Sequence, residues 1–206
     1  MLRGDALIDC PADAIDRLEI GRQLGGFLAR VHAAAPTRAP RIYHDSFPAD
    51  VIAFRRELDE ANEALPTPIA SACERLFAHA PSPDTRPPRF HHGDLGVEHI
   101  LVDRDRNRIT AIIDWGDAGW GNPVGDLVGL WAWGGDTAVR AALAACDQQL
   151  SRGDWARLRL WGVAYAIGSA YYGYKDHRDP LHATALGWLE RMFCAGQLAD
   201  PGTPDA

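Results

Sequence analysis

Two short runs rich in isoleucine and valine limit the folds open to this chain: HILVD (99–103) and RITAIIDW (108–115). They are joined by the charged segment RDRNR, and such a pair predicts two strands of a hairpin with a polar connection. Elsewhere the apolar residues recur at helical intervals, as Leu24, Leu28 and Val31 do. The sequence therefore predicts a mainly α fold with one small β-hairpin inserted.

The expected helices stand on both sides of this hairpin. Pro36 ends the first helix, Pro68 suits the first turn of the third, and the segment PSPDTRPP reads as a loop, not as a linker between domains. We expect one domain over residues 1–197 and a disordered tail over residues 198–206, which has nothing to bury. The helices are expected near residues 14–34, 49–65, 67–80, 136–150, 152–174 and 180–195.

Composition is useful here mainly for what it excludes. With 206 residues, of which 47% are hydrophobic, the chain can bury a sizeable core. Its first residues contain no apolar segment long enough for a signal peptide, and nowhere do eighteen apolar residues run together, so we expect a soluble cytoplasmic protein that does not bind membranes. A net charge of −7 argues against nucleic acid as a partner and is compatible with a cationic small molecule. The four cysteines form no C-x-x-C pair and are expected to be small buried side chains.

Three side chains suited to phosphate chemistry stand at the ends of the expected hairpin. Asp94 begins the loop that leads into the first strand, His99 ends that loop, and Asp114 follows the second strand. A hairpin would bring them to one edge, where they can hold a divalent cation and position a hydroxyl group. Gly93 and Gly116 flank the aspartates and permit close approach of other groups. Each segment taken alone is better explained as a polar turn, because Asp and His next to Gly are ordinary turn residues.

Together, the two segments HGDLGVEHIL (92–101) and IIDWGDAGWGNPVGDL (112–127) resemble the aminoglycoside phosphotransferase family. These antibiotic kinases and their relatives share the protein-kinase fold, and their motifs read H-G-D-L-x-x-x-N-I-L and I-D-W or I-D-F followed by G-D-P-x-x-D. The match is closest to the 2''-aminoglycoside and macrolide phosphotransferases. The resemblance implies the C-terminal lobe of the kinase-like fold. It also implies Mg²⁺-dependent transfer of the γ-phosphate of ATP or GTP to a small-molecule hydroxyl.

The resemblance also assigns roles to individual residues. Asp94 corresponds to the catalytic base, His92 to the residue that buttresses its loop, and Asp126 to the buried aspartate that holds the loop backbone. Asp114 and His99 correspond to the magnesium ligands. His99 replaces the usual asparagine, and because magnesium prefers oxygen donors, it either binds the metal or only makes a hydrogen bond.

Acceptor recognition is less constrained by the sequence. In the family the acceptor lies between the catalytic loop and the later helices, where acidic side chains receive cationic amines. Asp117 is a candidate for such a contact. The alternative is that Asp117 is a residue of a surface turn without a role in binding. Aromatic residues at helical spacings are more often part of a core than a ligand platform. We expect this of Trp131, Trp133, Trp161, Tyr165, Tyr171, Tyr172 and Tyr174.

The family's N-terminal lobe has no counterpart in the sequence. There is no G-x-G-x-x-G loop, and the only lysine, Lys175, lies near the C-terminus. We expect either part of a longer phosphotransferase or a shortened protein that holds ATP weakly. The alternative from another functional class is a degenerate kinase lobe that binds a small molecule or a protein without transferring phosphate. An unrelated helical scaffold with a chance motif is the third reading.

Overall fold

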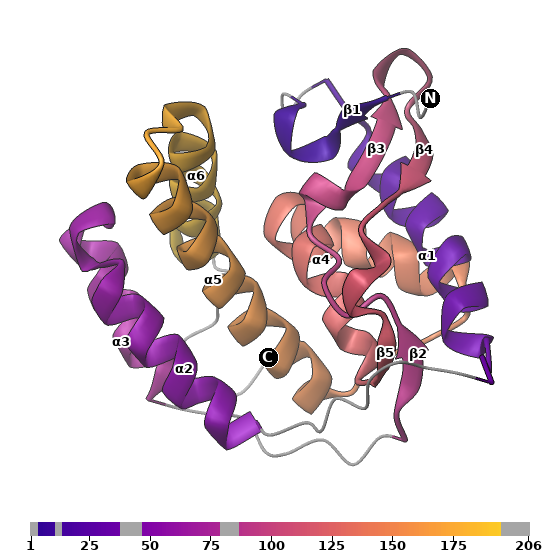
Figure 1. Cartoon of the computed structure of the whole chain (residues 1–206), viewed down its shortest axis with the longest axis horizontal. Helices are drawn as coiled ribbons and strands as arrows, with labels where there is room; N and C mark the ends of the chain where they lie inside the picture. Colours follow the sequence, from indigo (N-terminus) through magenta and orange to yellow (C-terminus); the bar gives the residue numbers. More distant parts are fainter. Residues whose placement is uncertain (1–3, 11–13, 38–46, 79–86, 195–206) are drawn as a thin grey trace.

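The computed structural model describes residues 4–10, 14–37, 47–78 and 87–194. It is mainly helical with two small antiparallel sheets (Figure 1). The helices are α1 (Arg17–Ala33), α2 (Phe47–Glu60), α3 (Thr67–Phe77), α4 (Val128–Ala145), α5 (Arg152–Lys175) and α6 (Asp179–Cys194). The strands are β1 (Asp5–Ala6), β2 (Arg89–His91), β3 (Ile100–Asp103), β4 (Arg108–Ile112) and β5 (Gly119–Gly121). This confirms the mainly α fold class.

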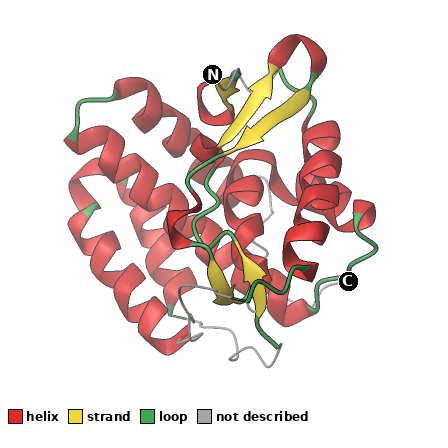
Figure 2. Cartoon of the chain, turned by 45° about the vertical axis from the view of Figure 1, so that its right-hand side comes forward, coloured by secondary structure: helices red, strands yellow, loops and turns green. Residues whose placement is uncertain are grey.

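The predicted hairpin is present as β3 and β4, and β1 adds a third antiparallel strand beside β3. Asp103 accepts a hydrogen bond from the Arg106 backbone at 3.2 Å, and Asn107 adopts a left-handed conformation that closes the polar turn. A second sheet, which the sequence did not predict, pairs β2 with β5 so that His91 lies opposite Gly119. Figure 2 shows this short pair near the centre of the molecule. The pairing places the segment that follows β2 beside the segment that precedes β5.

Helices α1 and α4 pack closely because small residues line their contact. Asp16 caps α1 by accepting hydrogen bonds from the backbone of the first turn, which explains why the helix begins at Arg17. A Cβ atom added to Gly21 would lie 2.3 Å from the carbonyl oxygen of Ala138. One added to Gly25 would lie 2.1 Å from that of Ala142. The two helix backbones therefore touch without intervening side chains, next to the hairpin.

On the other side of the molecule, the α2–α3 pair packs on α5 (Figure 1). Pro68 stands in the first turn of α3, as expected. One hydrophobic cluster links this pair to the rest of the chain, with Phe77 of α3 and Trp131 of α4 among its fully buried members. Trp133 is also buried, so the expectation that Trp131 and Trp133 belong to the core is confirmed.

Some helix boundaries differ from those predicted. The helix expected near 136–150 is α4, which runs from Val128 to Ala145. The helix therefore begins before the predicted 136, and it has a kink at Gly135, whose φ is 69°. Helix α2 ends before the predicted 65 because a 3-10 turn follows it at Asn62–Ala64. Most of PSPDTRPP and the tail 198–206 lie outside the described residues.

The described cysteines and helices bear on two further expectations. Cys10 and Cys73 are free and buried, as expected, while the free Cys146 is only partly covered. Among the described helices, none has both the length and the apolar character that a membrane span needs.

Candidate active site

Residues 92–99, which connect β2 to β3, form the centre of the site, and we refer to them as the 92–99 loop. Asp126, in the 3-10 turn before α4, holds the start of this loop. Its carboxylate accepts hydrogen bonds from the backbone N–H of His92, at 3.0 Å from Oδ2, and of Gly93, at 3.3 Å from Oδ1. Because the side chain of Asp126 is fully buried, these bonds fix the loop backbone firmly.

Two histidines keep Asp126 ionised inside the protein. Burial by itself would raise the pKa of the Asp126 carboxyl, but the hydrogen bond with His32 and the adjacent ring of His91 outweigh burial and hold this pKa well below its usual range. The His32 Nε2 atom lies 2.9 Å from Oδ2, and the His91 Nδ1 atom lies 3.6 Å from Oδ1. The anchor of the 92–99 loop is therefore an anion near neutral pH.

Gly93 allows the 92–99 loop to lie against the chain after β4. Its φ of +86° falls in the left-handed region that favours glycine. A Cβ atom at this position would also lie 2.3 Å from the carbonyl oxygen of Asp117. Glycine is thus needed both for the turn and for the close approach of the two motif segments.

His92 links the same two segments through its side chain. Its Nε2 atom lies 2.9 Å from the carbonyl oxygen of Ile113, so Nε2 is the protonated nitrogen that donates. The His92 ring also packs against Trp115, with 4.6 Å between the ring centroids. Trp115 in turn donates a hydrogen bond to the carbonyl of Ile112 at 3.0 Å. These contacts hold the start of the 92–99 loop against the chain that follows β4.

His99 and Asp114 face each other at the edge of the hairpin. The Nε2 atom of His99 lies 3.7 Å from Oδ2 of Asp114. His99 Nδ1 lies 2.8 Å from the carbonyl oxygen of Asp94, and because a carbonyl only accepts, Nδ1 carries the proton. The Nε2 atom is left on the side of Asp114. Asp114 has a left-handed backbone, at φ 60°, and its side chain is 64% exposed.

The chemistry of this pair suits a divalent cation, but its spacing needs a small adjustment. Two ligands of one octahedral Mg²⁺ ion lie about 3 Å apart when adjacent and about 4 Å apart when opposite, so the 3.7 Å observed matches neither value and the exposed Asp114 side chain would have to shift to bind the ion. Among the described residues, no group of three or more His, Cys, Asp or Glu side chains is placed to hold a metal. An ion here would take its other ligands from phosphate and water, as protein-bound magnesium commonly does.

A cavity of about 710 Å³ opens beside the 92–99 loop. Asp94, an exposed residue, lines it, while His99 and Asp114 do not. Two further carboxylates line the same cavity, those of Glu98 in the loop and Glu57 in α2. Burial raises the pKa of the Glu57 carboxyl. Asp94 thus lies where the cavity meets the loop that carries His99.

The structure brings five of the sequence-predicted residues together: Asp94, His99, Asp114, His92 and Asp126. Asp117 is half-buried and is not among the residues that line the cavity, so the structure gives no support to its expected contact with the acceptor. The expectation that the later aromatic residues form core was wrong for Tyr172 and Tyr174, which are 50% and 45% exposed. Trp161, Tyr165 and Tyr171 are partly buried and pack against the core. Trp161 and Tyr165 also line the cavity.

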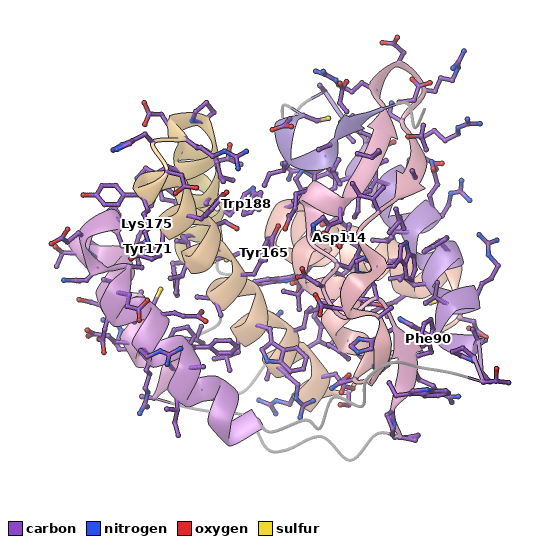
Figure 3. The ribbon with its side chains drawn as sticks, in the orientation of Figure 1. Phe90, Asp114, Tyr165, Tyr171, Lys175 and Trp188 are labelled. Atoms are coloured by element: carbon purple, nitrogen blue, oxygen red, sulfur yellow. The ribbon has the colours of Figure 1, made fainter. Side chains whose placement is uncertain are left out.

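Sequence reasoning missed several residues of this site. Glu98 lies inside the motif and could have been found from its place between Asp94 and His99. Glu57, Tyr165 and His32 lie in helices far away in the sequence, and no local pattern marks them. Figure 3 shows Tyr165 on α5, between that helix and the part of the chain that carries Asp114.

The site can now be compared with known proteins. The model of the family described as "Phosphotransferase enzyme family" matches residues 2–161. The structure of the GDP and kanamycin complex of APH(2")-IIia aligns over 95% of this chain and over 69% of its own length, with 19% sequence identity and a TM-score of 0.64. Macrolide 2'-phosphotransferase MphH from Brachybacterium faecium matches 92% of this chain and 68% of its own, with 21% identity and a TM-score of 0.52. These similarities show a kinase-like fold.

Proposed function

Because this chain belongs to the phosphotransferase enzyme family, we propose that it moves the γ-phosphate of ATP or GTP to a hydroxyl group of a small molecule. One observation carries the proposal. Asp94 lines the cavity, and its backbone carbonyl is hydrogen-bonded to His99, which faces Asp114. A group that accepts a proton from an acceptor in the cavity therefore stands next to a pair whose chemistry suits a phosphate-bound metal.

Asp94 is the proposed catalytic base. Its carboxylate is exposed at the cavity wall, where it can accept a hydrogen bond from an acceptor hydroxyl and then take its proton. The backbone around it is held by the buried Asp126, so the carboxylate is presented from a rigid loop. Rigid presentation matters because phosphoryl transfer depends mainly on positioning and electrostatics.

His99 and Asp114 are the proposed ligands of Mg²⁺. When bound, this ion would neutralise the charge of the nucleotide phosphates. The protonated Nδ1 of His99 donates to the Asp94 carbonyl, which leaves Nε2 as a possible donor atom to the metal. The hydrogen-bonding role and the metal role expected as alternatives for His99 are therefore compatible in this structure.

The acceptor is proposed to be a cationic molecule of moderate size that carries a hydroxyl group. The cavity of about 710 Å³ is large enough for such a molecule, and three carboxylates line it: Glu57, Asp94 and Glu98. Two similar structures point the same way: one contains kanamycin, and a thermostable mutant of APH(4)-Ia contains AMP-PNP and hygromycin B. The latter matches 98% of this chain and 70% of its own, with 17% identity and a TM-score of 0.56. Aminoglycosides and macrolides are the first acceptors to assay, and their phosphorylation in the cytoplasm would confer antibiotic resistance.

The decisive experiment replaces the proposed base. The full chain and its Asp94→Asn variant are incubated with Mg²⁺, ATP or GTP and each acceptor, and phosphorylated product is measured by mass spectrometry. We expect Asp94→Asn to lower kcat by about 10²–10⁴-fold with an unchanged circular dichroism spectrum. Asp105→Asn, at the exposed tip of the hairpin, is the matched control and should retain full activity. Equal turnover by the Asp94→Asn variant and the wild type would exclude the assignment.

A further inference from the structure

Two arginines and a tryptophan come together where α1, α4 and α6 meet. Arg191 of α6 donates hydrogen bonds from Nη2 to the carbonyl oxygens of Ala132 and Trp133, the latter at 3.0 Å. The guanidinium carbon of Arg17, the first residue of α1, lies 5.8 Å from the centre of the Trp133 ring. We refer to Arg17, Trp133 and Arg191 as the arginine cluster. None of the three lines the cavity beside the 92–99 loop.

Each member of the arginine cluster has a buried N–H group for which the described residues provide no acceptor. These groups are Nε of Arg17, Nε1 of Trp133 and Nε of Arg191. Trp133 is only 3% exposed, so bulk water does not replace the missing acceptor. A buried donor without a partner costs free energy, and an acceptor atom bound in the cluster would recover it.

The positive charge of the arginine cluster is not balanced by the described part of the chain. No carboxylate there forms an ion pair with Arg17 or Arg191, and burial together with the charge of Arg17 lowers the pKa of the Arg191 guanidinium. Arg17 also stands at the N-terminus of α1, where the helix dipole disfavours a cation. The acidic residues at this end of α1 are engaged elsewhere, since Asp16 caps the helix and Glu19 is paired with Arg22.

We propose that the arginine cluster is a binding site for one small oxyanion, a phosphate or a carboxylate group. A water molecule could accept the same hydrogen bonds, but it would leave two neighbouring cations uncompensated. An oxyanion supplies both the acceptor atoms and the opposite charge, and guanidinium groups bind phosphate and carboxylate in a fixed geometry. The site shares no residue with the cavity, so the inference does not rest on the proposed function.

The first test follows thermal unfolding of the full chain in increasing inorganic phosphate. Chloride keeps the ionic strength constant, and nucleotide and Mg²⁺ are left out. A ligand that binds only the folded protein raises Tm, and we expect a rise that saturates for the wild type. Arg17→Gln, which removes one charge of the cluster, should lose this rise. Arg152→Gln is the matched control and should keep it, because Arg152 is also the first residue of its helix but is exposed.

The comparison between variants separates specific binding from two other effects. Phosphate stabilises folded proteins in general because it is excluded from their surface, and this effect should raise the Tm of all three proteins equally. A merely structural role of Arg17 would lower the Tm of Arg17→Gln by the same amount at every phosphate concentration. Calorimetry measures the binding directly, and phosphate is expected to bind Arg17→Gln at least tenfold more weakly than the wild type.

A double variant identifies the source of the oxyanion, which is either the solution or the carboxylates of Asp200 and Asp205 in this chain. If phosphate raises the Tm of the wild type and of Asp200→Asn/Asp205→Asn alike, the ligand comes from solution. If only the double variant responds to phosphate, the chain's own carboxylates occupy the cluster in the wild type. Both results support the proposal. It is overturned if phosphate gives no saturating rise in either protein, or if Arg17→Gln leaves the rise intact.

Discussion

At the scale of single residues, Asp126 shows how a buried charge can serve a neighbouring site. It accepts hydrogen bonds from the backbone of His92 and Gly93 and contacts the rings of His32 and His91. Each of these partners can donate, whereas the carboxylate can only accept. The arrangement therefore selects the ionised form of Asp126, and any neutral replacement leaves a donor unmatched.

Asp126→Asn is accordingly expected to lower the free energy of unfolding by about 3 kcal/mol at pH 7. The folded pKa of Asp126 is depressed, so its contribution is present above the unfolded pKa of about 3.9 and is lost as pH falls toward the folded value. The difference between the two proteins should thus shrink below about pH 4. Urea unfolding over a range of pH measures this, and a constant difference across that range would contradict it.

Asp114 gives a second prediction at this scale. Because the Asp114 carboxylate faces His99 Nε2, Asp114→Ala should weaken the magnesium-dependent part of nucleotide affinity at least tenfold. Calorimetry with ATP or GTP, with and without Mg²⁺, measures this loss. Asp105→Ala is the control on the same hairpin. Identical magnesium dependence in the wild type and Asp114→Ala would exclude the metal role.

How far the sequence predicted the site follows from where each residue lies along the chain. Asp94, His99 and Asp114 stand in two short motifs at the ends of a recognisable hairpin, so their meeting could be foreseen. His32 and Tyr165 reach the same site from helices that are distant in the sequence, and only tertiary packing shows this. The charge of Glu98 was visible in the sequence. The conformation of its side chain depends on the hydrogen bond with Tyr165 and could not be predicted from the motif.

At the scale of elements, the α1–α4 contact determines how the hairpin side of the molecule is held. The contact depends on backbone touching backbone at Gly21 and Gly25. The periodicity of the sequence predicted the buried face of α1, but not that its glycines would be a packing surface. It also placed the start of α4 too late, near 136 instead of Val128, and gave no sign of the kink at Gly135, whose positive φ glycine permits.

Adjacent glycines of α1 allow a matched test. Gly25→Ala should lower the free energy of unfolding by about 1–3 kcal/mol, because its Cβ would overlap the Ala142 backbone. Gly26→Ala should raise it by about 0.5–1 kcal/mol, since nothing lies within 4 Å of its Cβ position and alanine favours the helix. Thermal or urea unfolding distinguishes the two, and changes of the same sign would contradict the packing described here.

At the scale of the whole molecule, one hydrophobic cluster joins the α2–α3 pair to the hairpin side, with the cavity at the boundary. Phe77, which is fully buried, lies in the part of this cluster contributed by α3. We therefore expect Phe77→Ala to lower the stability of the entire fold by about 3–5 kcal/mol in a single transition. Circular dichroism and tryptophan fluorescence should report the same midpoint. Separate midpoints would mean that the α2–α3 pair unfolds independently.

The hydrogen bond of 2.8 Å between His99 Nδ1 and the Asp94 carbonyl has a consequence for how two ligands influence each other. It ties the residue that faces the proposed metal to the residue that faces the proposed acceptor. Any restraint that the nucleotide places on His99 is then transmitted to Asp94. In the same way, any restraint that the acceptor places on Asp94 is transmitted to His99. By thermodynamic reciprocity, the factor by which nucleotide changes acceptor affinity must equal the factor by which acceptor changes nucleotide affinity. The two substrates are thus expected to share a single coupling free energy, whichever of them binds first.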